Sequence, residues 1–151
     1  MTKIIKGDLV LKKDTVLNED LIVHGNIIGK DHMKFSLFVE GSIEANNIKI
    51  KYIKASNIKA NQVESEKIIS QLINVNSLET WDINSKEIDC YEINSNHVDC
   101  QTLSAHKIEA DFIVCDKFIP KNTDSKIIAK VFLENKKIPR KEWMFTKEIV
   151  A

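Results

Sequence analysis

A large apolar residue recurs at every fifth position between Ile43 and Phe118, and this repeat constrains the fold more than any other feature of the chain. An α-helix repeats its apolar face about every 3.6 residues and a flat strand every 2, so neither element fits a period of five. The period instead predicts a coil built from short extended sides, each ending in a corner. The sixteen members of the series are Ile43, Ile48, Ile53, Ile58, Val63, Ile68, Ile73, Leu78, Ile83, Ile88, Ile93, Val98, Leu103, Ile108, Ile113 and Phe118.

A second, mostly small residue follows two positions after each large one. In an extended segment, residues two apart point to the same face, so we expect both residues to face inward. The position after the small residue is mostly polar and compatible with turns, which is typical of a corner. The small set is Ala45, Ile50, Ala55, Ala60, Ser65, Ser70, Val75, Thr80, Ser85, Cys90, Ser95, Cys100, Ala105, Ala110, Cys115 and Pro120.

The number of sides sets the length of one coil. Four sides predict a coil of about 20 residues, so that the run makes almost four coils over roughly 19 Å. Ile48 then stacks on Ile68, and Ile53 stacks on Ile73. A three-sided coil is the alternative, but its usual repeat is six, and we identify no six-residue period in the chain.

The repeat, in units such as Ile58-Lys59-Ala60, resembles that of the pentapeptide-repeat family. The family's usual motif, A-[DN]-L-x-x, places the small residue two before the large one. Here the small residue comes two after it, an order that resembles a variant group of bacterial and phage proteins. The resemblance implies an all-β fold, a right-handed four-sided parallel β-helix of about four coils.

Residues 1–42 predict an irregular β cap at the start of the solenoid. The pattern L-x-V-x-G-x-I occurs at residues 21–27 and again at residues 37–43. Two copies of one strand-turn-strand unit are expected to stack, with Gly25 and Gly41 at equivalent corners that need unusual backbone angles.

Residues 43–120 form the predicted solenoid, and residues 121–151 predict a C-terminal cap or a dimerisation segment in the same domain. Ile127, Ile128, Val131 and Phe132 follow helical spacing after a polar loop, which predicts a helix through about Asn135. A final apolar cluster comprises Trp143, Met144, Phe145, Ile149 and Val150. A solenoid needs its open apolar end covered, so capping is the expected task of this segment.

The three cysteines occupy small inward positions and are expected to be buried thiols. In a four-sided coil Cys90, Cys100 and Cys115 fall on three different sides, whereas His97 and His106 lie on outward or corner positions. A metal site therefore cannot form from these residues, and we expect no metal, no other cofactor and no small-molecule ligand. The chain has no apolar stretch long enough for a membrane span and no evident signal peptide, so we expect a cytoplasmic protein.

No catalytic constellation emerges, so a non-enzymatic structural or protein-interaction module is the predicted function. The alternative is a DNA mimic that binds a type II topoisomerase such as gyrase, a property known in the pentapeptide-repeat family. Residues 79–117 carry nine acidic residues and three lysines, a net of −6, and Asp89, Asp99 and Glu109 represent this candidate acidic surface. The formal net charge of the whole chain is zero, which argues against direct nucleic-acid binding. Bactofilin-like filament formers, which are short solenoids that polymerise end to end, are a further comparison.

One side of a 20-residue coil presents a column of outward apolar residues. The predicted members of this candidate interface are Tyr52, Leu72, Phe112 and Val114. Large side chains about 5–10 Å apart on a flat β face are typical of an interface. We therefore expect this side to pack on a second copy of the chain or under the chain's own C-terminal segment.

Overall fold

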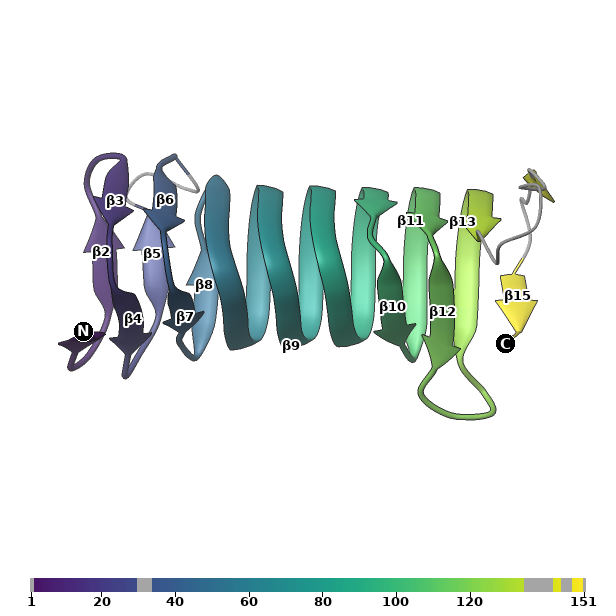
Figure 1. Cartoon of the computed structure of the whole chain (residues 1–151), viewed down its shortest axis with the longest axis horizontal. Helices are drawn as coiled ribbons and strands as arrows, with labels where there is room; N and C mark the ends of the chain where they lie inside the picture. The colour runs from purple at the N-terminus through teal and green to yellow at the C-terminus, as the bar shows by residue number, and fades with distance from the viewer. Residues whose placement is uncertain (1, 30–33, 135–142, 145–147, 151) are drawn as a thin grey trace.

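The computed structural model describes residues 2–29, 34–134, 143–144 and 148–150, and these residues form a β-solenoid without helices. About eight coils stack along one axis, with the N-terminus at one end and the C-terminus at the other (Figure 1). Strands of successive coils pair in parallel, which satisfies the backbone hydrogen bonds between coils. The predicted β-helix is therefore confirmed.

The strands are short at the N-terminal end and nearly continuous in the middle. β9 (Tyr52–Asp99) winds through 48 residues without a break. The strands before it are β1 (Thr2–Ile5), β2 (Leu9–Leu11), β3 (Thr15–Leu17), β4 (Asp20–Val23), β5 (Ile27–Gly29), β6 (Ser36–Val39), β7 (Ser42–Glu44) and β8 (Asn47–Lys49). Those after it are β10 (Thr102–Ala105), β11 (Lys107–Cys115), β12 (Lys117–Pro120), β13 (Lys126–Glu134), β14 (Trp143–Met144) and β15 (Glu148–Val150).

The pairing register shows that each coil has three sides, so the predicted four-sided coil of 20 residues is wrong. Ile43 pairs with Ile58, and Ile88 pairs with Leu103, an offset of 15 residues in both cases. Within β9 the hydrogen bond from Ser65 to Thr80 spans the same 15 residues. The period of five sets the length of a side, but it leaves open how many sides close a coil. The shorter coil also explains why about eight coils replace the predicted four. The right hand of the coil stays a prediction from the resemblance.

We name the three sides by the columns of inward residues that run along them, one residue from each of coils 1 to 8. The column of side 1 is Lys3, Leu21, Ile43, Ile58, Ile73, Ile88, Leu103 and Phe118. The column of side 2 is Leu9, Ile27, Ile48, Val63, Leu78, Ile93, Ile108 and Ile127. The column of side 3 is Thr15, Leu37, Ile53, Ile68, Ile83, Val98, Ile113 and Phe132.

The first coil has sides of six residues, a period that the sequence analysis missed. Asp8, Asp14 and Asp20 each precede a strand and lie six residues apart. Consistent with three such sides, Thr2 pairs with Asp20 and Leu9 with Ile27, an offset of 18 residues. The coil therefore begins with six-residue sides and continues with five-residue sides.

These aspartates bind the backbone of the next coil. Asp8 Oδ1 accepts a hydrogen bond from the Asn26 amide at 2.8 Å, and Asp20 Oδ1 accepts one from the Ser42 amide at 2.8 Å. A Cβ at Gly41 would lie 1.9 Å from Asp20 Oδ1, so glycine is required there by the close approach of the carboxylate.

The two L-x-V-x-G-x-I copies do not stack on each other as predicted. Leu21 lies on side 1 and pairs with Ile43, whereas Leu37 lies on side 3 and pairs with Ile53. Gly25 and Gly41 occupy different corners, and neither has a positive φ, a value found only at Gly7 among the described residues. What the two glycines share is the aspartate packed against each of them.

Large aliphatic side chains fill the axis of the solenoid, as the repeat predicts. Every large residue of the series from Ile43 to Ile113 is at most 3% exposed, and Phe118 is half-buried. The small positions are inward too, although Ala60 is half-buried and Pro120 is exposed. Burial of each large aliphatic side chain contributes roughly 1.5–3 kcal/mol.

Hydroxyl groups at the small inward positions satisfy their own hydrogen-bonding needs. Ser70 Oγ donates to the Leu72 carbonyl at 3.0 Å, and Ser85 Oγ donates to the Glu87 carbonyl at 3.0 Å. Each bond spans a corner, from the end of one side to the start of the next. A buried serine therefore carries no unpaired polar group here, which explains why serine alternates with alanine and cysteine in the repeat.

The predicted C-terminal helix is wrong, because residues 126–134 form β13. After an insertion of four residues the five-residue rule resumes at Ile127 and Phe132, with Ala129 two residues after the first of them. β14 and β15 then pair antiparallel with β13, so the last coil has a hydrogen-bonded strand on its outer edge. Of the predicted apolar cluster, Phe145 lies outside the described residues.

Candidate interaction surface

Outward-facing apolar residues gather on side 3 of the solenoid. Each side of a coil has two outward positions, one before and one after its inward column residue. Among the described residues, side 3 has eight apolar residues at these positions, whereas side 1 has four and side 2 has three. The eight are Val16, Phe38, Tyr52, Ile69, Phe112, Val114, Val131 and Leu133.

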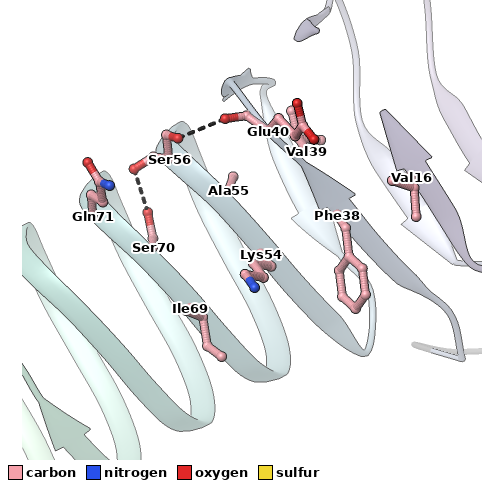
Figure 2. Close-up of a pocket in the computed structure, with 10 residues that line it drawn as sticks. All are labelled: Val16, Phe38, Val39, Glu40, Lys54, Ala55, Ser56, Ile69, Ser70 and Gln71. Carbon is pink, nitrogen blue, oxygen red and sulfur yellow. Dashed lines mark hydrogen bonds between the residues drawn. The ribbon is translucent and has the colours of Figure 1, made fainter. Parts of the chain in front are cut away.

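At the N-terminal end of side 3 the apolar residues line an open hollow of about 430 Å³ (Figure 2). Val16, Phe38, Lys54 and Ile69 lie one after another along it, from coils 1 to 4. Val16 is 65% exposed and Phe38 is 39% exposed. Beside the hollow, the Phe38 and Tyr52 rings meet edge to face with centroids 5.2 Å apart.

The edge of this hollow is held by hydroxyl groups at the corner between sides 3 and 1. Ser56 Oγ donates to the Glu40 carbonyl at 2.8 Å, and Ser70 Oγ contacts the Ser56 carbonyl at 3.1 Å (Figure 2). These bonds join successive coils, so they fix the spacing of the residues that line the hollow.

The middle of side 3 is charged, with basic residues followed by acidic ones. Lys54 and Lys67 lie on coils 3 and 4, and Lys67 Nζ sits 5.9 Å above the Tyr52 ring. Asp82 and Asp99 lie on coils 5 and 6. Asp82 Oδ1 is 3.2 Å from His97 Nδ1, and both side chains remain nearly half exposed. The charge therefore changes sign halfway along the rod.

At the C-terminal end, side 3 becomes apolar again. Phe112 pairs in register with Val131, and Val114 pairs with Leu133. Phe112 is 48% exposed, whereas Val131 is buried. Side 3 thus has two apolar ends with a charged centre.

The structure brings together three of the four predicted interface residues. Tyr52, Phe112 and Val114 lie on side 3, whereas Leu72 lies on side 1 in the column position occupied on the next coils by Glu87 and Thr102. Tyr52 and Phe112 are also separated by four coils, so the continuous column predicted from a 20-residue coil does not exist.

The residues of the predicted acidic surface lie on three different sides. Asp89 is on side 1, where it forms an ion pair with Lys121, and Asp99 is on side 3. Glu109 is on side 2, where it lines a hollow of about 240 Å³ with Glu79, Glu92 and Lys107. No single side therefore presents all of the predicted acidic residues.

The three cysteines are buried at inward positions, but on two sides rather than three. Cys90 lies on side 1, whereas Cys100 and Cys115 lie on adjacent coils of side 3. Burial raises the pKa of the Cys90 thiol to about 12. Burial also raises the pKa of Cys100, and the neighbouring Cys115 adds to that shift. These thiols are therefore protonated and poorly nucleophilic at neutral pH.

Neither a metal site nor a membrane-spanning helix is found in the part of the chain that the structure describes. No three histidine, cysteine, aspartate or glutamate side chains there converge in a way that could hold a metal ion. In the same residues, no helix has the length and apolar character needed to cross a membrane.

The fold places the chain in the class of β-solenoid repeat proteins. Comparisons with protein-family models, with curated proteins and with solved structures find no match to this chain. The functional argument therefore depends on the surface of the rod itself.

Proposed function

We propose that the chain is a non-enzymatic structural module that self-associates. The observation that carries this proposal is the gathering of eight outward apolar residues on one side of the rod. Contiguous exposed apolar patches on soluble proteins mark interaction sites more often than catalytic ones when the surface is flat. The outward residues of the other two sides are mostly polar, which supports a contact through side 3.

The interior of the rod supports a structural task. Aliphatic side chains fill the axis, so the solenoid has no internal space in which a substrate could be enclosed. Backbone hydrogen bonds connect each coil to its neighbours, which gives a stiff element of defined length. We assign this function to the cytoplasm, where thiols such as Cys90 and Cys100 stay reduced.

The proposal is tested by sedimentation of the purified chain over a range of concentrations. We expect a species heavier than the 17.3 kDa monomer, and we expect Phe112→Arg on side 3 to weaken its formation. Leu72→Arg makes the same chemical change at an outward apolar position of side 1, so it is the matched control. A chain that stays monomeric at every concentration contradicts the proposal.

DNA mimicry is the second candidate, and the net charge of −6 in residues 79–117 is the observation that favours it. Duplex DNA carries about one charge per 1.7 Å, so two coils on one side would need roughly six acidic groups. Side 2 offers three there, Glu79, Glu92 and Glu109. A gyrase supercoiling assay tests this candidate: inhibition by micromolar protein, relieved by lysine at Asp89, Asp99 and Glu109, supports mimicry.

A further inference from the structure

The outward residues of side 3 match a second copy of the same side placed in the opposite direction. In this arrangement coil 1 faces coil 8, coil 2 faces coil 7, coil 3 faces coil 6, and coil 4 faces coil 5. A two-fold axis parallel to the strands produces it, because such an axis reverses the rod but keeps the direction of each strand. The position before a column residue then faces the same position on the other copy, and so does the position after it.

The charged residues of side 3 pair under this operation. Lys54, after the column residue of coil 3, faces Asp99, after the column residue of coil 6. Lys67, before the column residue of coil 4, faces Asp82, before that of coil 5. Symmetry repeats each pair, so four contacts between opposite charges form across the centre of the interface.

The apolar residues at the two ends pair as well. Val16 on coil 1 faces Leu133 on coil 8, and Phe38 on coil 2 faces Val114 on coil 7. These residues line or continue the hollow in Figure 2, so the second copy brings aliphatic side chains to an apolar depression. Burial of such side chains supplies attraction, whereas the charge pairs fix the direction and the register of the two rods.

The same operation fails on the other two sides. On side 1 it places Glu44 of coil 3 against Asp89 of coil 6. On side 2 it places Glu64 of coil 4 against Glu79 of coil 5. Like charges that face each other oppose association, so the complementarity is particular to side 3.

The size of side 3 fits a modest dimer. Eight coils at about 4.8 Å and a side about 16 Å wide give roughly 600 Å² on each copy, or about 1,200 Å² in total. Specific interfaces begin near this value, and weak ones are found at the low end of the range. Association is therefore expected to depend on protein concentration and, through the charge pairs, on salt.

We infer that the chain forms an antiparallel homodimer through side 3, an inference that rests on the proposed function and names its partner as a second copy. Lys54 and Asp99 lie on the same column of side 3 but three coils apart, or about 14 Å, so they do not pair within one chain. In the dimer each faces the other across the interface. This difference separates the inference from any account confined to the monomer.

Charge reversal and rescue test the inference. Lys54→Glu places two carboxylates against each other at both symmetric contacts, and Asp99→Lys places two ammonium groups together. We expect each single variant to shift the weight-average mass from about twice 17.3 kDa towards 17.3 kDa, with at least a tenfold weaker dimer. The double variant Lys54→Glu with Asp99→Lys restores opposite charges, so dimerisation should return.

Lys59→Glu on side 1 is the control, because it changes the net charge by the same amount at an exposed position away from side 3. Circular dichroism of each variant checks that the β signal is kept. A dimer that ignores both single reversals, or a double variant that stays monomeric, overturns this interface. The first outcome leaves self-association intact through another surface, such as the open edges of the first coil. A wild-type chain that is monomeric throughout overturns the proposed function together with this inference.

Discussion

Replacing Ile88 by alanine tests the assignment of the inward column most directly. Ile88 is 1% exposed and lies in the column of side 1 between Ile73 and Leu103. The change removes three carbon atoms, worth about 2.4 kcal/mol of burial at roughly 0.8 kcal/mol each, and it leaves a cavity between two coils. With the cavity included, we expect a loss of about 3–4 kcal/mol, within the range of 2–5 kcal/mol for such substitutions.

Urea unfolding followed by circular dichroism measures this loss. Ile88→Asp should be more destabilising still, because a carboxylate in the column has no partner. The neighbouring Glu87 is exposed and outward, so Glu87→Ala should change the stability by less than about 0.5 kcal/mol. Similar losses for Ile88→Ala and Glu87→Ala would refute the assignment of inward and outward positions.

Three further predictions concern the length of the coil, the first corners and a buried thiol. Deleting residues 71–85 removes one coil of 15 residues and keeps every later residue on its side, so the variant should unfold cooperatively, whereas deleting residues 71–90 shifts all later residues by one side and should cost much more stability in a thermal melt. Gly41→Ala should destabilise the chain by about 1–3 kcal/mol by displacing the Asp20 carboxylate, and a double-mutant cycle should show a much smaller effect when Asp20 is already alanine. Since the pKa of Cys90 rises from 9.0 to about 12 on folding, its contribution to stability is complete below pH 9 and falls by about 1.4 kcal/mol per pH unit above it. Urea unfolding between pH 8 and 10 should therefore show a shallower decline for Cys90→Ala than for the wild type, and equal slopes would contradict this.

The inward positions could be predicted from the sequence because burial acts on every residue of a side in the same way. From Ile43 to Ile113 all large residues of the series are buried, and the small residues two positions later face inward with them. The number of sides could not be derived in that manner. A five-residue side fits a corner of a triangle or of a square, and only the pairing of one coil with the next distinguishes them.

Two signals were present in the sequence but were not used. The aspartates at positions 8, 14 and 20 mark six-residue sides, the usual length in three-sided solenoids, and they indicate the shape of the coil. Ile127, Ala129 and Phe132 repeat the pattern of large and small residues after an insertion, but their spacing also fits one face of a helix. Leu72 was grouped with Phe112 because a 20-residue coil places them on one side.

The unequal ends of the rod give its unfolding a direction. β1, β2 and β3 each pair with a strand on one edge only, whereas β14 and β15 cover the outer edge of β13. In a solenoid each coil depends on its nearest neighbours, so the first coil can open while the next remains intact. Amide hydrogen exchange should then be fastest in coil 1 and slow progressively towards the middle of β9, in the manner of a zipper that opens from its N-terminal end.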